Sequence, residues 1–286
     1  MKNRRIQNIK YEFLHNKQAI FAACFLVFIS LLSLIIVFVP IDPDAIDVTS
    51  MLQGPSGEHW FGTDEVGRDY LARIIYGGRI SLLVGFLAMF TSVTIGVTVG
   101  ITAGYFGGRL DNILMRITDM FSSIPYLIMV TVINMLFTRG LTSIIFSIGF
   151  FSWMEIARLV RAETLSLKER EYIQYAQFIG TSSSRIMIKQ IIPSVSPLII
   201  TAASLAIARA IMTETTLSFL GMGVQQPMSS WGSLLQKAQS YMAKAPYMAI
   251  LPGILIILTI YSFNKLGDVL RVFAEPRVTA GESNES

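Results

Sequence analysis

One uninterrupted apolar run constrains this chain more than any other feature. Residues Ala19 to Val39 include no charged side chain. A helix of about twenty residues, rising 1.5 Å per residue, crosses the ~30 Å hydrocarbon core of a bilayer. A cleaved signal peptide is the competing interpretation, but the run is too long for one and no small-x-small cleavage site precedes Pro40. The run therefore predicts a first membrane-spanning helix.

Five further apolar stretches and the overall composition agree with a bilayer environment. Hydrophobic residues make up 52% of the 286 positions and charged residues only 15%. We therefore predict an all-α membrane protein with about six transmembrane helices. The fourth and fifth of the six stretches are short or interrupted by charge, so each also fits a tilted or broken helix. The five stretches are Ile80 to Ala103, Phe121 to Phe137, Leu141 to Met154, Pro197 to Met212 and Pro246 to Phe263.

The predicted organisation is a single membrane domain with polar ends and no internal repeat. Its parts are a cytoplasmic N-terminal segment (1–18), the first transmembrane helix (19–39), an extracytoplasmic loop (40–79), a transmembrane domain (80–272) with its largest cytoplasmic loop at 158–196, and a cytoplasmic tail (273–286).

The distribution of lysine and arginine predicts the orientation. Cytoplasmic loops carry the excess of positive charge near the ends of membrane spans. With the N-terminus inside, about sixteen of the 23 lysines and arginines fall in cytoplasmic segments, whereas the first outer loop is rich in Asp and Glu. We expect both termini in the cytoplasm of a multi-pass protein of the inner membrane. The net charge of +4 follows this sidedness and forms no single basic stripe, so nucleic acid is not an expected partner.

The loop 158–196 predicts a helix–turn–helix on the cytoplasmic side. Leu165, Tyr172, Ala176 and Ile179 recur at helical spacing, and Gly180 supplies a residue that can adopt the left-handed conformation at a helix end. Ser182 or Ser183 can cap the second helix, and Pro193 and Pro197 mark the return into the membrane. Two interpretations stay open, an interfacial helix lying on lipid and a docking surface for another protein.

A stripe of small residues and four ionisable groups distinguish the spans. Ser92, Gly96, Gly100 and Gly104 share one face of the second span, which permits close helix packing either within the chain or with a partner subunit. Charge in hydrocarbon is costly, so ionisable groups there are functional candidates. Arg209 and Glu214 lie five residues apart, about 140° around a helix, and cannot pair with each other. We consider both for a translocation path or gate, or Glu214 for the outer mouth of a shorter span. The four groups are Glu155, Arg158, Arg209 and Glu214.

Several kinds of chemistry have no matching residues. The phosphate-binding pattern G-x-x-x-x-G-K-[ST] does not occur, so the chain has no such ATP cradle. His15 and His59 are the only histidines and Cys24 is the only cysteine, so we expect no metal site, no disulfide and no cofactor in the chain. An isolated residue such as His59 is most simply a surface side chain.

Five segments, in order, carry a family resemblance. They are His59-Trp-Phe-Gly-Thr-Asp-Glu-Val-Gly-Arg-Asp69 running on to Arg79-Ile-Ser-Leu-Leu83, then Gly104-Tyr-Phe-Gly-Gly-Arg-Leu-Asp111, Ala157-Arg-Leu-Val-Arg161, Arg170-Glu-Tyr-Ile-Gln-Tyr-Ala-Gln-Phe-Ile-Gly180 with Ile192-Pro193, and Glu214-Thr-Thr-Leu-Ser-Phe-Leu-Gly221 with Ser230-Trp-Gly232. Together they resemble the dipeptide, oligopeptide and nickel permease family, in its C-type subunit. The fourth segment is similar to the Glu-Ala-Ala loop of such permeases, with Gln174 and Tyr175 in place of the motif's Glu and first Ala.

The resemblance implies a type I ABC importer fold and a set of partners. These are a second permease subunit in a heterodimer, two cytoplasmic ATPases that bind ATP and Mg, an extracytoplasmic solute-binding protein and membrane lipid. The residues implied in ATPase coupling are Glu171, Gln174, Tyr175, Ala176, Gly180 and Pro193. The expected function is ATP-driven uptake of di- or oligopeptides.

Three alternatives remain at this point. The same class of importer can carry nickel or another small solute. A stand-alone secondary transporter or channel would need ion-coupling or filter residues, and carboxylates are scarce in the spans. A membrane-embedded enzyme would need converging catalytic groups that two histidines do not supply.

Overall fold

The computed structural model describes residues 16–38, 42–137 and 140–274, and nearly all of its regular structure is helical. The chain begins with α2 (Lys17–Ile35) and a 3₁₀ turn (Ile36–Phe38), and a second 3₁₀ turn (Val48–Ser50) lies in the irregular segment before α3 (Tyr70–Phe106). The remaining elements are α4 (Gly108–Ser122), α5 (Tyr126–Leu136), α6 (Leu141–Phe151), α7 (Trp153–Lys168), α8 (Glu171–Phe178), α9 (Ser183–Ile186), a π-helical turn (Met187–Ile191), α10 (Ile192–Phe219), α11 (Trp231–Ala238), a 3₁₀ turn (Gln239–Tyr241) and α12 (Tyr247–Ala274).

The number of spans agrees with the prediction, but the third span has another shape. Among the described residues, five helical stretches are long and apolar enough to cross a membrane, and α4 with α5 makes a sixth if the pair counts as one span. That pair is bent by 84°, and the apolar stretch predicted at 121–137 lies across the bend instead of forming one continuous helix. The bend falls at Ile124 and Pro125, where proline cannot continue the helical hydrogen bonds and disfavours helical geometry in the residue before it.

Two segments predicted as loops, 40–79 and 158–196, include the start of the helix that follows them. Helix α3 already begins at Tyr70, capped by Asp69, whose carboxylate accepts a hydrogen bond from the Ala72 amide at 2.9 Å, so the end of the predicted loop 40–79 is helical. Helix α10 runs continuously through Pro193 and Pro197, which therefore do not interrupt it. The π-helical turn lies directly before Pro193, and the Ile192 amide bonds to the Met187 carbonyl five residues back.

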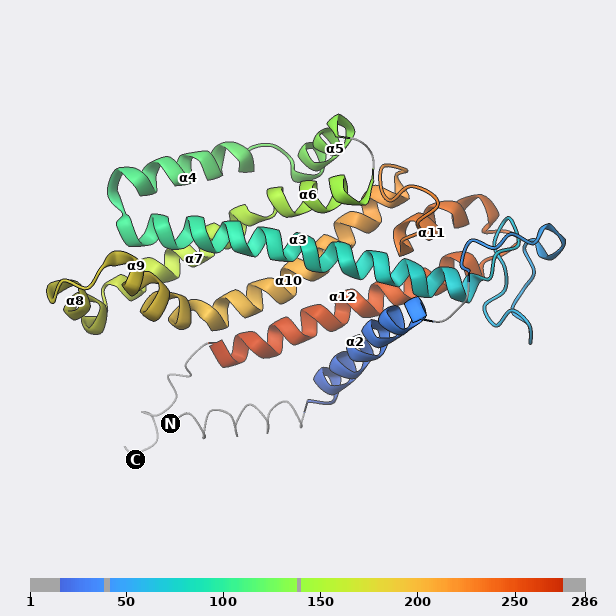
Figure 1. Cartoon of the computed structure of the whole chain (residues 1–286), viewed down its shortest axis with the longest axis horizontal. Coiled ribbons are helices and arrows are strands. Elements are labelled where there is room, and N and C mark those ends of the chain that lie inside the picture. Colours follow the sequence, from blue (N-terminus) through green and yellow to red (C-terminus); the bar gives the residue numbers. More distant parts are fainter. Residues whose placement is uncertain (1–15, 39–41, 138–139, 275–286) are drawn as a thin grey trace, which may run out of the picture.

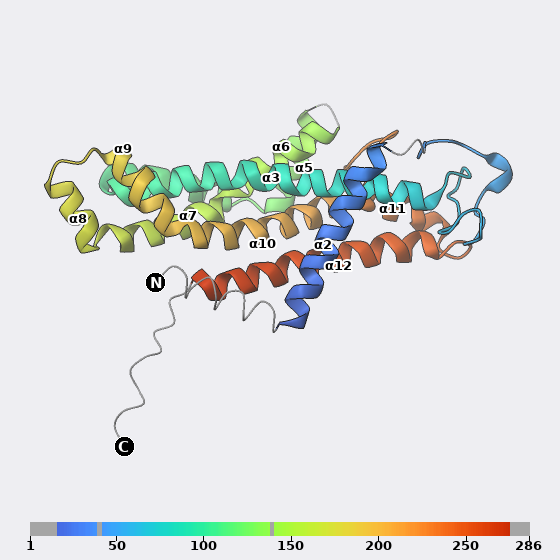
Figure 2. The ribbon, with the colours of Figure 1, turned by 60° about the horizontal axis from the view of Figure 1, so that its bottom comes forward.

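The helices form an elongated bundle with distinct ends (Figure 1). Helix α3 packs against α7, α6 and α10, and α10 packs against α12. Helices α8 and α9 lie at one end, whereas α11 and the segment 42–69 lie at the other (Figure 1). Helix α2 contacts α12 and crosses the bundle obliquely, as Figure 2 shows.

The stripe of small residues on α3 faces α7 of the same chain. Ser92 is buried, and its hydroxyl donates to the Met89 carbonyl at 3.0 Å. A Cβ added to Gly96 would lie 2.7 Å from the Ile156 Cβ, one added to Gly100 would lie 2.6 Å from the Ala157 carbonyl oxygen, and one added to Gly104 would lie 2.7 Å from the Thr164 Cβ. Because even a methyl group does not fit without movement, these glycines set the distance between the two helices.

We predict that Gly100→Leu destabilises the bundle by about 1–3 kcal/mol, because the new side chain forces α3 and α7 apart. The matched control is Gly253→Leu in α12, where an added Cβ meets no atom within 4 Å. Thermal unfolding of the detergent-purified protein, followed by circular dichroism, measures the effect. Equal midpoints for both variants would show that the close approach does not matter for stability.

Candidate functional site

The end of the bundle that carries α8 presents an exposed apolar tip, which we define as Tyr172, Tyr175, Phe178 and Ile179. Phe178 is 88% exposed and Tyr175 is 66% exposed. The opposite side of α8 is anchored, because Ile173 and Ala176 are buried in a cluster with Ile186 and Ile191. The chain therefore holds α8 firmly and leaves aromatic side chains projecting from it.

Gly180 ends α8 in the predicted left-handed conformation, with φ of 79°. The Gly180 amide donates to the Gln177 carbonyl and the Thr181 amide to the Ala176 carbonyl, each at 3.0 Å, which is the Schellman arrangement at a helix end. A Cβ added at Gly180 meets no atom of the chain within 4 Å. This turn is consequently open toward any molecule that approaches it.

Other details of the predicted helix–turn–helix are wrong. The first helix is interrupted after Lys168, so Leu165, Tyr172, Ala176 and Ile179 do not form one buried face, and Leu167, Ile173 and Ala176 are buried instead. Ser182 stands at the start of α9 but makes no side-chain capping bond. The second helix is the beginning of the long α10 segment. Among the residues implied in coupling, Glu171, Gln174 and Tyr175 are exposed, Ala176 is buried, and Pro193 lies in the first turn of α10.

Midway along the bundle, Arg209 of α10 forms an ion pair with Glu155 of α7. The sequence predicted only that Arg209 needs a partner other than Glu214, because the partner lies 54 residues away in the chain. A second ion pair, between Arg158 and Asp119, spans 3.0 Å nearby, and Arg158 also donates to Ser122 at 2.8 Å. Glu155, Arg158 and Arg209 line one cavity of about 490 Å³ between α4, α5, α7 and α10.

Glu214 is separate from this cavity and entirely buried. Its carboxylate accepts hydrogen bonds from Ser218 at 2.6 Å and from Ser81 of α3 at 3.1 Å. The Ser81 hydroxyl in turn accepts the Trp231 amide of α11 at 3.2 Å. Helix α10 extends to Phe219, so Glu214 lies within the helix and not beyond its end. Glu214 instead links α10 to α3 and, through Ser81, to the start of α11.

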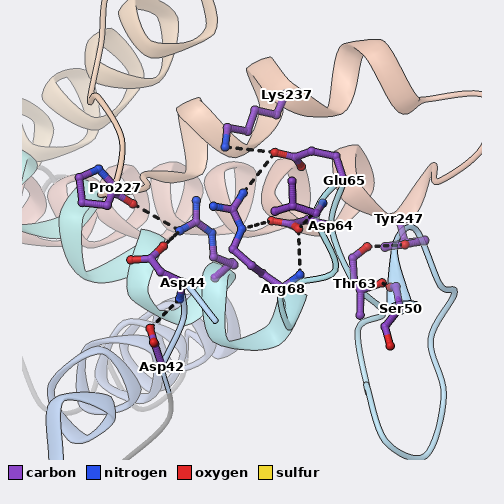
Figure 3. Close-up of polar contacts among 12 residues, drawn as sticks. Asp42, Asp44, Ser50, Thr63, Asp64, Glu65, Arg68, Pro227, Lys237 and Tyr247 are labelled. Atoms are coloured by element: carbon purple, nitrogen blue, oxygen red, sulfur yellow. Dashed lines mark hydrogen bonds and ion pairs between the residues drawn. The ribbon is translucent and has the colours of Figure 1, made fainter. Parts of the chain in front are cut away.

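A network of charges holds the segment 42–69 to the bundle (Figure 3). Arg68 bonds to Asp64 at 2.6 Å and to Glu65 at 3.2 Å, and Lys237 of α11 lies 3.2 Å from Glu65. Arg73 of α3, almost completely buried, pairs with Asp44. Sequence reasoning counted these residues only as loop charges, because their pairing depends on tertiary contacts.

The same segment includes two smaller polar features. Hydrogen bonds from the hydroxyls of Ser50 and Thr49, and from the Thr49 amide, hold the pKa of Asp47 below its ordinary value. The His59 ring nitrogen Nδ1 lies 3.0 Å from the Asp69 carboxylate. In the part of the chain that the structure describes, no group of three or more His, Cys, Asp or Glu residues is placed to hold a metal ion.

Helix α11 was not predicted, although its start has a recognisable signal. Ser230 and Ser233 form a reciprocal capping box, in which each side chain bonds to the backbone of the other. Trp231 is completely buried and its indole nitrogen donates to the Ile74 carbonyl of α3 at 3.0 Å. The motif Ser230-Trp-Gly232 therefore fixes α11 against α3.

Several characterised proteins are similar to this chain along nearly its whole length. The oligopeptide transport system permease protein OppC of Haemophilus influenzae is 40% identical over 274 residues, which cover 95% of this chain and 88% of that protein. OppC of Escherichia coli K12 is 39% identical over 277 residues, which cover 95% of this chain and 91% of that protein. The glutathione transport system permease protein GsiD of Escherichia coli O6:K15:H31 is 38% identical over 232 residues, covering 81% and 77%.

Solved structures show the same fold at low sequence identity. A chain from an inward-facing structure of the MetNI methionine ABC transporter superposes with a TM-score of 0.59 at 18% identity, covering 71% of this chain and 97% of that one. A chain from an amino acid ABC transporter crystallised with histidines gives a TM-score of 0.52 at 16% identity, covering 72% and 92%. The predicted type I ABC importer fold is thereby confirmed.

The model of one family matches residues 96–280, which include α4 to α12 and most of the features described above. Together with relatives about 40% identical over 95% of the chain, this match settles the assignment. The chain belongs to the family of binding-protein-dependent transport system inner membrane components.

Proposed function

We propose that this chain is a permease subunit of an ATP-driven importer that takes up short peptides. The observation that carries the proposal is the similarity to two oligopeptide permeases over 95% of the chain. The chain has few carboxylates in its apolar stretches and lacks the phosphate-binding pattern. Both features fit a subunit whose energy comes from ATP bound by another subunit. A second, different permease, two cytoplasmic ATPases that bind ATP and Mg, and an extracytoplasmic solute-binding protein complete the proposed assembly.

The ATPase contact is assigned in this proposal to the apolar tip of α8 and the turn at Gly180. Exposed aromatic side chains beside an open glycine turn suit insertion into a groove of another protein. The anchored residues Ile173 and Ala176 would transmit a movement of α8 to the bundle, because they are packed against the beginning of α10. Glu171 and Gln174 are exposed at the rim of the tip, where they can make polar contacts.

The orientation in this proposal places α8 in the cytoplasm and the segment 42–69 outside. The distribution of lysine and arginine supports it, and the two regions do lie at opposite ends of the bundle (Figure 1). The charge network of Figure 3 would then face the solute-binding protein.

Reconstitution tests the proposed function directly. We expect liposomes containing this chain, its second permease and two ATPases to accumulate a radiolabelled tripeptide only when both ATP and the binding protein are supplied. Uptake that persists without ATP or without the binding protein would favour the stand-alone transporter instead. Uptake of nickel but not of tripeptide would show that the importer carries nickel instead of peptides.

Cysteine labelling tests the orientation. Gly54 is exposed, and a Cβ added there meets no atom within 4 Å, so Gly54→Cys in a Cys24→Ser background should leave the fold intact. We expect a membrane-impermeant maleimide to label Gly54→Cys in intact cells and to label the matched variant Phe178→Cys only after permeabilisation. The reverse pattern would contradict the proposed topology.

Substitutions at Gly180 test the ATPase contact. Both Gly180→Ala and Gly180→Trp force a side chain into a left-handed position, at a cost of about 1–2 kcal/mol, but only tryptophan adds bulk. Because the turn is open within the chain, the extra bulk should act only on a docked partner. We expect Gly180→Trp to insert normally, to lose co-purifying ATPase and to lose uptake, while Gly180→Ala retains most of both.

Crosslinking provides the second measurement. Phe178→Cys should form a crosslink to the co-expressed ATPase, whereas a cysteine at Gly54 should not. If Phe178→Cys fails to crosslink and Gly180→Trp supports normal uptake, the tip is an interfacial surface in contact with lipid.

A further inference from the structure

The ion pair between Arg209 and Glu155 lies deep within the membrane-spanning part of the bundle. The chain has no charged residue between Arg79 of α3 and Arg109 of α4, and this charge-free stretch marks the depth of the bilayer interior. An added Cβ at Gly85 of α3 would contact Ile211 and Ile207, which flank Arg209, and one at Gly96 would contact Ile156, next to Glu155. The pair therefore lies at the depth of α3 residues 85–96, well inside the charge-free stretch.

Despite this depth, both side chains are accessible. The side chain of Arg209 is 54% exposed and that of Glu155 is 69% exposed. Exposure of a charged pair to lipid is costly, so this face of the bundle must border water or another protein. It borders the cavity of about 490 Å³ that both residues line, a size typical of small-molecule sites.

The pair retains hydrogen-bonding capacity. Arg209 carries five N–H donors and uses Nη1 on Glu155, and one oxygen of Glu155 accepts it. The neighbouring Arg158 is occupied by Asp119 and Ser122, and the Thr213 hydroxyl donates to the Arg209 carbonyl at 2.9 Å. Among the described residues, Arg209 and Glu155 are thus the charged groups of the cavity lining whose side chains pair only with each other.

The rest of the lining suits ligands of variable shape. Three methionines and two phenylalanines form the apolar wall, and methionine side chains adapt to differently shaped partners because they are unbranched, flexible and polarisable. The hydroxyls of Tyr126 and Ser152, 3.0 Å apart, lie in the same lining. These methionines and phenylalanines are Phe121, Met129, Phe151, Met154 and Met212, and Ile124 and Pro125 are also part of the lining.

We propose that this cavity is a transient binding site for the two charged ends of a short peptide, an inference that rests on the proposed peptide uptake. The peptide carboxylate pairs with Arg209 and the peptide ammonium pairs with Glu155. Binding therefore replaces the one ion pair between these side chains with two ion pairs to the peptide. Every peptide with free ends carries these groups whatever its side chains, and the methionine wall accommodates the side chains. The site therefore selects zwitterionic peptides without selecting sequence.

Modified peptides separate the two contacts. Uptake is measured in the reconstituted assembly with a free tripeptide, its C-terminal amide and its N-acetyl form, each at concentrations that saturate the binding protein. We expect Arg209→Gln to lower uptake of the free and N-acetyl peptides about tenfold while leaving the amide at the wild-type rate, because the amide has no carboxylate to lose. Glu155→Gln should lower uptake of the free peptide and of the amide and leave the N-acetyl peptide at the wild-type rate, because the N-acetyl peptide has no ammonium group.

Two further variants control for structural damage. Arg209→Lys keeps the cation and should retain the preference for the free peptide over its amide. Arg161→Gln breaks a similar ion pair, with Asp111 at 2.6 Å, outside the cavity lining, and should affect all three peptides alike. If Arg209→Gln and Glu155→Gln also change all three uptake rates in parallel, or change none, the inference is wrong although peptide uptake stands. If the wild-type assembly takes up no peptide at all, both proposals are wrong.

Discussion

Close packing of α3 against α7 is the interaction on which the other parts of this structure depend. Lipid tails are as apolar as leucine, so no hydrophobic force draws helices together within a bilayer, and close van der Waals contact must do so. Gly96 and Gly100 bring the α3 backbone within contact of α7, and Gly149 of α6 makes a similar approach to Ala88 and Thr91. The position of α7 then determines where Glu155 meets α10 and where α8 leaves the bundle.

The two ends of the bundle are stabilised in different ways. At the α8 end, apolar side chains such as Ile173 and Ile186 form a small core. At the other end, the segment 42–69 is held largely by pairs of opposite charge, and the buried side chains of Arg68 and Arg73 have carboxylate partners. Buried charges are tolerated only when paired, so loss of one partner there would leave the other uncompensated.

The sequence predicted those features that depend on composition or on local geometry. The number of spans follows from apolar length, and the left-handed Gly180 follows from the freedom of glycine at a helix end. The separation of Arg209 from Glu214 follows from the helical repeat alone. Features that need a distant partner were missed or wrong: Glu155 lies 54 residues from Arg209, and α11 is fixed by Trp231 against a carbonyl of α3. Helix α10 likewise continues through Pro193 and Pro197, and the π-helical turn directly before it is one that no propensity predicts.

The unbroken course of α10 has a mechanical consequence. Its 28 residues form a rod about 42 Å long that begins beside α8 and ends where Glu214 bonds to Ser81 of α3. A rod of that length turns a tilt of about 5° at one end into a displacement of roughly 4 Å at the other. Arg209 lies about two thirds of the way along this helix, so a push on the end beside α8 would slide it past Glu155 and change the width of the gap between α7 and α10. A single long helix would thus transmit a displacement from one end of the bundle to the other.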